Sequence, residues 1–160
     1  MKPGVLLVAV IVCLAVLPAS SAPADDRSLR EAGRSRDAQF ERLGEQTRRT
    51  YRAWQRAGHP RRLARRLLRL NRRTRLEIDL VRAALRPEQP SSEGGATYKR
   101  LMFRSLRVFD AALAWDARGV RTYMRGRRGA ARTAWRRAGR HFDRSVRLTR
   151  RAVRAIEGPP

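Results

Sequence analysis

The chain has little cysteine, histidine, lysine or acid. Its one cysteine, Cys13, falls in an N-terminal apolar segment, so disulfides cannot hold the remainder of the chain together. The two histidines, His59 and His141, are far apart, and neither has a carboxylate three residues away, as helical metal sites require. These absences predict no metal, no cofactor and no catalytic residues, and therefore a protein that is not an enzyme.

The first 24 residues have the pattern of a secretory signal peptide. Lys2 gives a charged start, residues 5–17 form an unbroken apolar run, and small residues follow up to Ala24. The run is shorter than the about 20 residues that span a membrane. We expect residues 1–24 to be cleaved after Ala24, which predicts a secreted or periplasmic protein. An uncleaved anchor is the competing interpretation.

Positive charge dominates the composition. The chain has 38 basic residues against 14 acidic ones, a formal net charge of +24, and only Lys2 and Lys99 among the basic residues are lysine. The planar guanidinium of arginine suits phosphate and carboxylate groups. A genome that favours arginine codons would give the same bias without any function. The charge is also uneven, because residues 46–76 contain twelve arginines and no acid.

Four segments repeat apolar residues at spacings of three and four, as amphipathic helices do. The expected helices cover residues 26–57, 60–86, 97–125 and the segment that follows the break at 125–129. No segment alternates with the period of a strand. Their apolar seams contain the following residues: Phe40, Leu43, Thr47, Thr50, Trp54 and Ala57; Leu63, Leu67, Leu70, Thr74, Glu77, Val81 and Ala84; Met102, Leu106, Phe109, Leu113, Asp116, Val120 and Tyr123; Trp135, Ala138, Phe142, Ser145, Thr149, Ala152 and Ile156.

This pattern predicts an all-α protein, an antiparallel up-down four-helix bundle after a cleavable signal peptide. Residues 25–160 form the single domain, with hairpins 26–86 and 97–157 joined by a loop at 87–96. A shift of 72 residues matches 13 of the 59 positions between Leu29 and Pro87. An ancient duplication of the hairpin is therefore one interpretation, although many matches arise by chance in so arginine-rich a chain.

Aromatic and acidic residues on the seams are interpreted as core residues. Trp54, Phe109 and the other seam aromatics favour packing over stacking on nucleic-acid bases. Glu77 and Asp116 also lie at seam positions, where a buried acid among many arginines is expected to be paired. A polar ligand pocket between helices is the alternative for these two acids.

Up-down connectivity places the turn at 58–60 and the break at 126–129 at one end of the bundle. The start of the second and fourth helices lies there too, and helix starts attract anions. The opposite end is expected to hold Asp25, Asp26, Glu31, Glu88, Glu93 and Glu157. The predicted anion-binding residues are Arg61, Arg62, Arg65, Arg66, Arg125, Arg127, Arg128 and Arg132, with Arg52, Arg56 and Arg121 beside them.

These features favour an exported, non-enzymatic protein that binds anionic polymers or lipid headgroups through its arginine-rich end. Contacts to phosphate carry no base information, so no specific nucleic acid is expected. The alternatives are a structural or chaperone-like envelope protein, and a peripheral membrane protein whose last helix leaves the bundle to lie on anionic lipid. Charge that serves only solubility is also left open.

Overall fold

The computed structural model describes residues 26–157, which form helices joined by short connections and contain no strand. Its helices are α2 (Arg27–Arg34), α3 (Asp37–Arg56), α4 (Arg61–Leu85), α5 (Glu93–Met124) and α6 (Arg128–Glu157). The prediction of an all-α helical bundle is confirmed, with α3 to α6 as its four long helices. The expected signal peptide, residues 1–24, lies outside the described residues.

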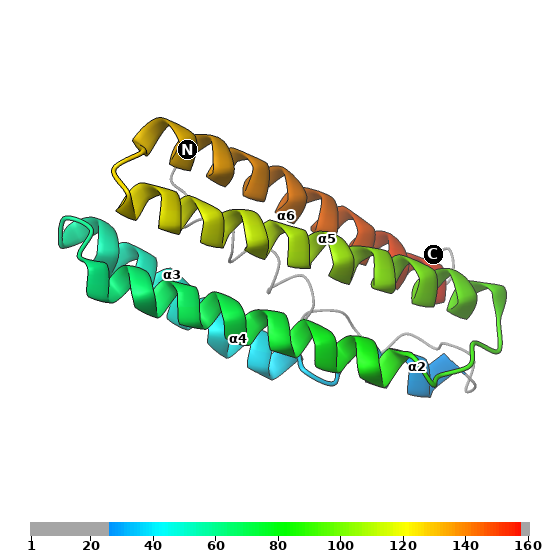
Figure 1. Cartoon of the computed structure of the whole chain (residues 1–160). Coiled ribbons are helices and arrows are strands. Elements are labelled where there is room, and N and C mark those ends of the chain that lie inside the picture. Colours follow the sequence, from blue (N-terminus) through cyan, green and yellow to red (C-terminus); the bar gives the residue numbers. More distant parts are fainter. Residues whose placement is uncertain (1–25, 158–160) are drawn as a thin grey trace.

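Consecutive long helices run in opposite directions and form two hairpins, α3–α4 and α5–α6 (Figure 1). The two hairpin turns lie at one end of the molecule, on the left in Figure 1. The loop between α4 and α5 lies at the other end, close to α2. The described packing contacts lie among residues 26–157, so a chain that begins at residue 25 contains all of them.

The predicted seams supply most of the core. Phe109 of α5 stands between Phe40 of α3 and Phe142 of α6, with ring centroids 6.1 and 5.6 Å apart, and all three rings are buried. Two expectations for individual residues were wrong. Helix spacing predicts that Ala57 lies on the first seam and that Leu80 widens the second seam, but both residues are exposed.

Hydroxyl groups connect α5 to α6 inside the core. Ser105 Oγ lies 2.9 Å from Ser145 Oγ and 2.7 Å from Thr149 Oγ1. Ser105 also donates to the carbonyl of Ser145, and the Ser145 hydroxyl donates back to the carbonyl of Ser105. Small side chains at these positions let the two helices approach closely, and the buried hydroxyls satisfy one another. Release of α6 to a membrane would first require these bonds to break.

The first predicted helix, 26–57, is interrupted in the structure. Arg36 leaves the helical region with φ −124° and ψ 11°, and the Ser35 hydroxyl donates to the carbonyl of Ala32 at 2.8 Å. The interruption allows α2 to turn and bury Gly33 beneath Tyr98 of α5, where a Cβ atom would collide with the tyrosine hydroxyl. Packing against α5 therefore overrides the continuous helical pattern of the sequence.

α5 begins at Glu93 rather than at residue 97, so the predicted loop at 87–96 was too long. Ser92 caps the helix, because its hydroxyl accepts a hydrogen bond from the backbone N–H of Gly95 at 2.9 Å. The glycine pair 94–95 had indicated a loop. In the structure Gly95 is buried against the carboxylate of Asp26, which leaves no room for a side chain.

Asp26 ties the start of the first segment to the start of α5. Its carboxylate accepts hydrogen bonds from the N–H and hydroxyl of Ser91, at 2.9 and 3.0 Å, and from the hydroxyl of Ser92. Burial pushes the pKa of Asp26 upward, but the hydrogen bonds from Ser92 and Ser91 together hold this pKa below its ordinary value. The charged carboxylate is therefore the form that this end of the bundle stabilises.

We expect Gly95→Ala to lower the free energy of unfolding by about 1–3 kcal/mol, because the new methyl group would displace the carboxylate of Asp26. Urea denaturation measures the change. Gly129→Ala is the matched control, since Gly129 also lies in the first turn of a helix but has open space around its Cβ position. A stability loss no larger in Gly95→Ala than in the control would contradict this role of Gly95.

Candidate functional site

The turn at residues 57–60 reaches across to the second hairpin. The ring of His59 lies 4.8 Å from that of Trp54 in its own hairpin and 4.7 Å from that of Tyr123 in α5, between ring centroids. Gly58 and His59 both have left-handed backbone angles, with φ of 70° and 68°, and the His59 N–H donates to the Trp54 carbonyl at 2.8 Å. The two hairpin turns therefore lie side by side.

Aromatic rings fill the space beneath these turns. The ring of Trp54 lies 6.2 Å from that of Trp135, and the ring of Trp135 lies 5.8 Å from that of Tyr123. We call the following residues the turn-end aromatic cluster: Tyr51, Trp54, His59, Tyr123 and Trp135. Trp54 is buried at its centre, with 1% of its surface exposed. Core packing, rather than an open stacking platform, is confirmed for Trp54, as it is for Phe40, Phe109 and Phe142.

The predicted anion-binding residues lie at the same end of the bundle as this cluster. We call them the arginine pole: Arg61, Arg62, Arg65, Arg66, Arg125, Arg127, Arg128 and Arg132. All eight are exposed, and among residues 26–157 none of them has a carboxylate oxygen within 4.0 Å. The sequence explains why: residues 46–76 and 117–142 contain twelve and nine arginines and no acid. Within the described residues, ion pairs therefore do not compensate the charge of the arginine pole.

Helix starts add to the positive field of the arginine pole. α4 begins at Arg61 and α6 at Arg128, and neither helix has an acidic residue in its first turn. Pro60, the residue before α4, makes no side-chain cap. Acidic side chains normally balance the free amides and the dipole of a helix start. The first turns of α4 and α6 contain arginines instead of acidic residues, so the arrangement favours a bound anion such as phosphate, sulfate or carboxylate.

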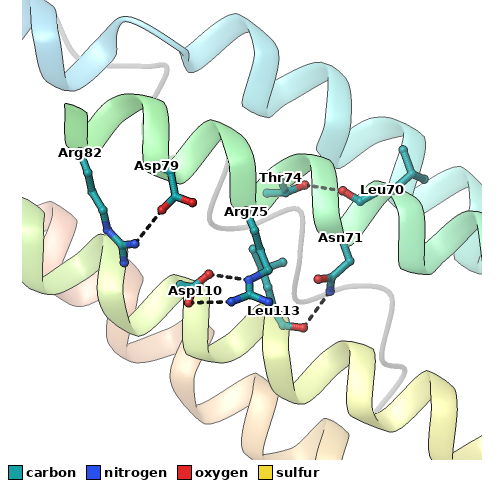
Figure 2. Close-up of polar contacts among 8 residues, drawn as sticks. All are labelled: Leu70, Asn71, Thr74, Arg75, Asp79, Arg82, Asp110 and Leu113. Atoms are coloured by element: carbon teal, nitrogen blue, oxygen red, sulfur yellow. Dashed lines mark hydrogen bonds and ion pairs between the residues drawn. The ribbon is translucent and has the colours of Figure 1, made fainter. Parts of the chain in front are cut away.

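Arginines elsewhere in the bundle do have acidic partners. Arg75 of α4 donates to both carboxylate oxygens of Asp110 on α5, from Nε at 2.6 Å and from Nη2 at 3.2 Å (Figure 2). Arg36 donates from Nε to Glu77 at 2.6 Å. Opposite charges thus pair outside the arginine pole, whereas the pole arginines carry positive charge without an ion-pair partner among residues 26–157.

Acidic residues gather near the opposite end, as predicted. Asp26 is bound to the loop between α4 and α5, which contains Glu88. Glu93 begins α5, and Glu157 ends α6 at the same end of the molecule (Figure 1). Glu31 lies in the neighbouring α2. Asp25 lies outside the described residues. The described bundle is therefore polar, with its uncompensated positive charge at the hairpin turns.

A buried acid lies beneath the arginine pole. Asp116 of α5 accepts hydrogen bonds from the hydroxyl of Tyr51 at 2.6 Å and from Nδ2 of Asn71 at 3.3 Å. Asn71 Nδ2 also donates to the carbonyl of Leu113 at 2.8 Å (Figure 2). Burial raises the pKa of Asp116 to about 6, against the lowering effect of the hydrogen bonds from Tyr51 and Asn71.

The expected pairing of buried acids with arginine was right for Glu77, which contacts Arg36, and wrong for Asp116. Among residues 26–157, the ion pairs of arginine do not include Asp116. Sequence reasoning missed Tyr51 and Asn71 as its partners. The sequence does contain one indication of a polar contact at Asn71, because this uncharged polar residue follows the seam residue Leu70.

Within residues 26–157, no three residues of the His, Cys, Asp and Glu types gather as the ligands of a metal ion. None of the helices in this range is both long and apolar enough to cross a membrane. Comparison of the chain with protein-family models, curated proteins and solved structures gave no match.

Proposed function

We propose that this protein is an exported, non-enzymatic, antiparallel four-helix bundle that binds anionic polymers or anionic headgroups through the arginine pole. One observation carries the proposal: eight exposed arginines, with no acidic partner among residues 26–157, lie in the connection before α6 and in the first two turns of α4 and α6. The signal-like segment at residues 1–24 supports export. Export would make anions of the envelope or of the extracellular space the natural partners.

A multivalent anion fits the arginine pole better than a small monovalent one. The pole arginines come from two separate hairpins, and contact between His59 and Tyr123 holds these hairpins together. A polymer can reach both groups at once, and each phosphate it contributes releases condensed counterions into solution. Binding should therefore weaken steeply as salt is raised.

The same geometry supports recognition of charge rather than of bases. Trp54 is enclosed by its neighbours, so the centre of the turn-end aromatic cluster offers no surface on which a base could stack. Arginine contacts to phosphate position a partner without reading its sequence. We therefore expect similar affinity for inorganic polyphosphate and for single-stranded nucleic acids of different base composition at equal charge.

The test measures binding of residues 25–160 to long-chain polyphosphate and to single-stranded DNA across a salt series. The variant carries Arg61→Gln, Arg62→Gln, Arg127→Gln and Arg128→Gln, all at exposed positions. We expect at least about a tenfold loss of affinity at about 0.1 M salt and a shallower salt dependence. The affinity and its salt slope are both read from fluorescence titrations.

A matched control removes the same charge from the rest of the bundle through Arg27→Gln, Arg86→Gln, Arg104→Gln and Arg151→Gln, which are also exposed. It should retain most of the affinity. Equal losses in the two variants would show that only net charge matters and would overturn the arginine pole as a site. Salt-resistant binding to unfolded proteins, with no affinity for polyphosphate, would favour the chaperone-like alternative instead.

A further inference from the structure

Two leucines on α4 are exposed to an unusual degree. Leu76 and Leu80 show 54% and 49% of their surface, and they are the exposed large hydrophobic residues within residues 26–157. They lie one helical turn apart and so form a single apolar spot on one face of α4. Ala83, which follows at the next position of this face, is exposed as well.

The same face carries arginines along its first half. Exposed residues at spacings of three and four join the arginine pole to the leucines in one line, which we call the outer face of α4: Arg62, Arg65, Arg69, Arg73, Leu76, Leu80 and Ala83. Arg72 flanks this line and is also exposed. No acidic partner exists for Arg69, Arg72 or Arg73 within the described chain. An apolar spot therefore continues directly from a row of free guanidinium groups.

Contacts to α5 fix which way this face points. Asn71 and Arg75 both bind α5, through the carbonyl of Leu113 and the carboxylate of Asp110 (Figure 2). The opposite side of α4 is consequently left at the surface. Its one acid near the leucines, Asp79, is engaged by Arg82 at 3.0 Å, as Figure 2 also shows.

We infer that the outer face of α4 docks on the surface of an anionic lipid bilayer. Leu76 and Leu80 would enter the boundary between headgroups and acyl chains, while Arg69, Arg72 and Arg73 would contact lipid phosphates. Apolar side chains beside free cations are the combination that binds anionic membrane surfaces. A second copy of this chain fits poorly, because its own arginine row would meet the first and the two would repel.

This inference rests on the proposed function, because Arg62 and Arg65 belong both to the arginine pole and to the outer face of α4. It differs from membrane binding through α6 in one respect. α6 would have to expose Phe142 and break the bonds of Ser145, both of which are buried in the bundle. Docking through α4 uses side chains that are already at the surface.

The first test compares flotation of residues 25–160 with vesicles of phosphatidylglycerol mixed into phosphatidylcholine and with vesicles of phosphatidylcholine alone. The apolar residues 5–17 are omitted because they would partition into lipid themselves. We expect binding to the anionic vesicles only. The double variant Leu76→Gln and Leu80→Gln should lose about tenfold or more of this affinity, since membrane binding scales with the apolar area buried. Its affinity for polyphosphate should not change.

The second test places an environment-sensitive fluorophore on the leucine spot through Leu80→Cys. The chain from residue 25 contains no other cysteine. The emission should shift to the blue with anionic vesicles and not with polyphosphate. A fluorophore at the exposed Ala114 of α5, introduced by Ala114→Cys, should shift with neither and serves as the control.

The outcomes separate the two ideas. If the leucine variant binds anionic vesicles as well as the unchanged protein, or if the fluorophore at residue 80 stays in water, the docking inference is wrong while polyphosphate binding still supports the arginine pole. A change in sedimentation mass that the leucine variant abolishes would assign the spot to a second copy and would also overturn the inference. Failure to bind either polyphosphate or vesicles would reject the proposed function itself.

Discussion

Replacing Trp54 with alanine is expected to lower the free energy of unfolding by about 3–5 kcal/mol, because it removes the centre of the turn-end aromatic cluster. The Trp54 ring contacts the rings of Tyr51, His59, Tyr123 and Trp135, with centroids 4.8 to 6.2 Å away. These neighbours come from both hairpins, so the cavity would open where the hairpins join. Large cavities of this kind are among the costliest single substitutions.

Urea denaturation followed by circular dichroism measures this effect, with Trp115→Ala as the matched control. Trp115 is only partly buried, and its ring is covered by the guanidinium groups of Arg118 and Arg137, at 5.0 and 4.7 Å from the ring centroid. Its removal should cost about 1–2 kcal/mol, since less apolar surface returns to water. Equal losses in the two variants would show that the cluster does not hold the two hairpins together.

The bundle is expected to become more stable as the pH falls from about 7.5 to about 5, through the buried Asp116 and the partly buried Asp37. Burial raises the pKa of Asp116 to about 6. Burial likewise raises the pKa of Asp37 to about 7, with Arg34 opposing the shift and Glu41 adding to it, and Asp37 Oδ1 has no hydrogen-bond partner among the described residues. In each case the neutral acid is the form that the fold prefers.

The sign of this pH dependence is set by how the pKa of each acid differs between the folded and unfolded chains. Folding raises the pKa of Asp116 above its ordinary value of 3.8, so the folded chain binds this proton more tightly than the unfolded chain does. Its contribution to stability is fully present below that value and is lost as the pH rises through about 6, which amounts to about 2–3 kcal/mol. Asp26 acts in the opposite direction. Its pKa is lowered on folding, so its contribution is lost as the pH falls below 3.8.

Thermal and urea unfolding at several pH values would test this profile, with Asp116→Asn as the informative variant. The amide keeps the shape of the side chain but cannot ionise, so much of the loss between about pH 5 and about pH 7.5 should disappear. Asp143→Asn, at an exposed position of α6, should keep the profile of the unchanged protein. A profile that is the same in all three proteins would remove Asp116 as its source.

Much of the fold could be predicted from helical periodicity. Phe109, Glu77 and Ser145 were assigned to seams by spacing alone, and all three are buried. Spacing succeeds because a helix presents every third or fourth residue on the same side, whatever its partner is. The exposure of the eight pole arginines could also be predicted, because they lie at the turns or off the apolar seams.

The errors occurred where a contact between distant segments decides the outcome. Leu80 lies near the α4 seam by spacing, but α4 rotates to place Asn71 and Arg75 against α5, and this turns Leu80 to the solvent. The sequence predicts Gly95 in a loop, but in the structure it lies in the first turn of α5, where the carboxylate of Asp26 fills the space beside it. The partners of Asp116 were missed for the same reason, since Tyr51 and Asn71 come from two other helices.

The sequence alone determined that the described chain is helical and strongly cationic. It also determined that the arginines near the two turns have no acidic residue close to them along the chain. These properties depend on residue type and on spacing within one helix, and not on contacts between helices. Tertiary structure decided that His59 meets Tyr123, that Asp116 is held by hydrogen bonds from Tyr51 and Asn71 rather than by an arginine, and that two leucines of α4 remain exposed. Each of these depends on the rotation and depth of one helix against another, which local spacing does not specify.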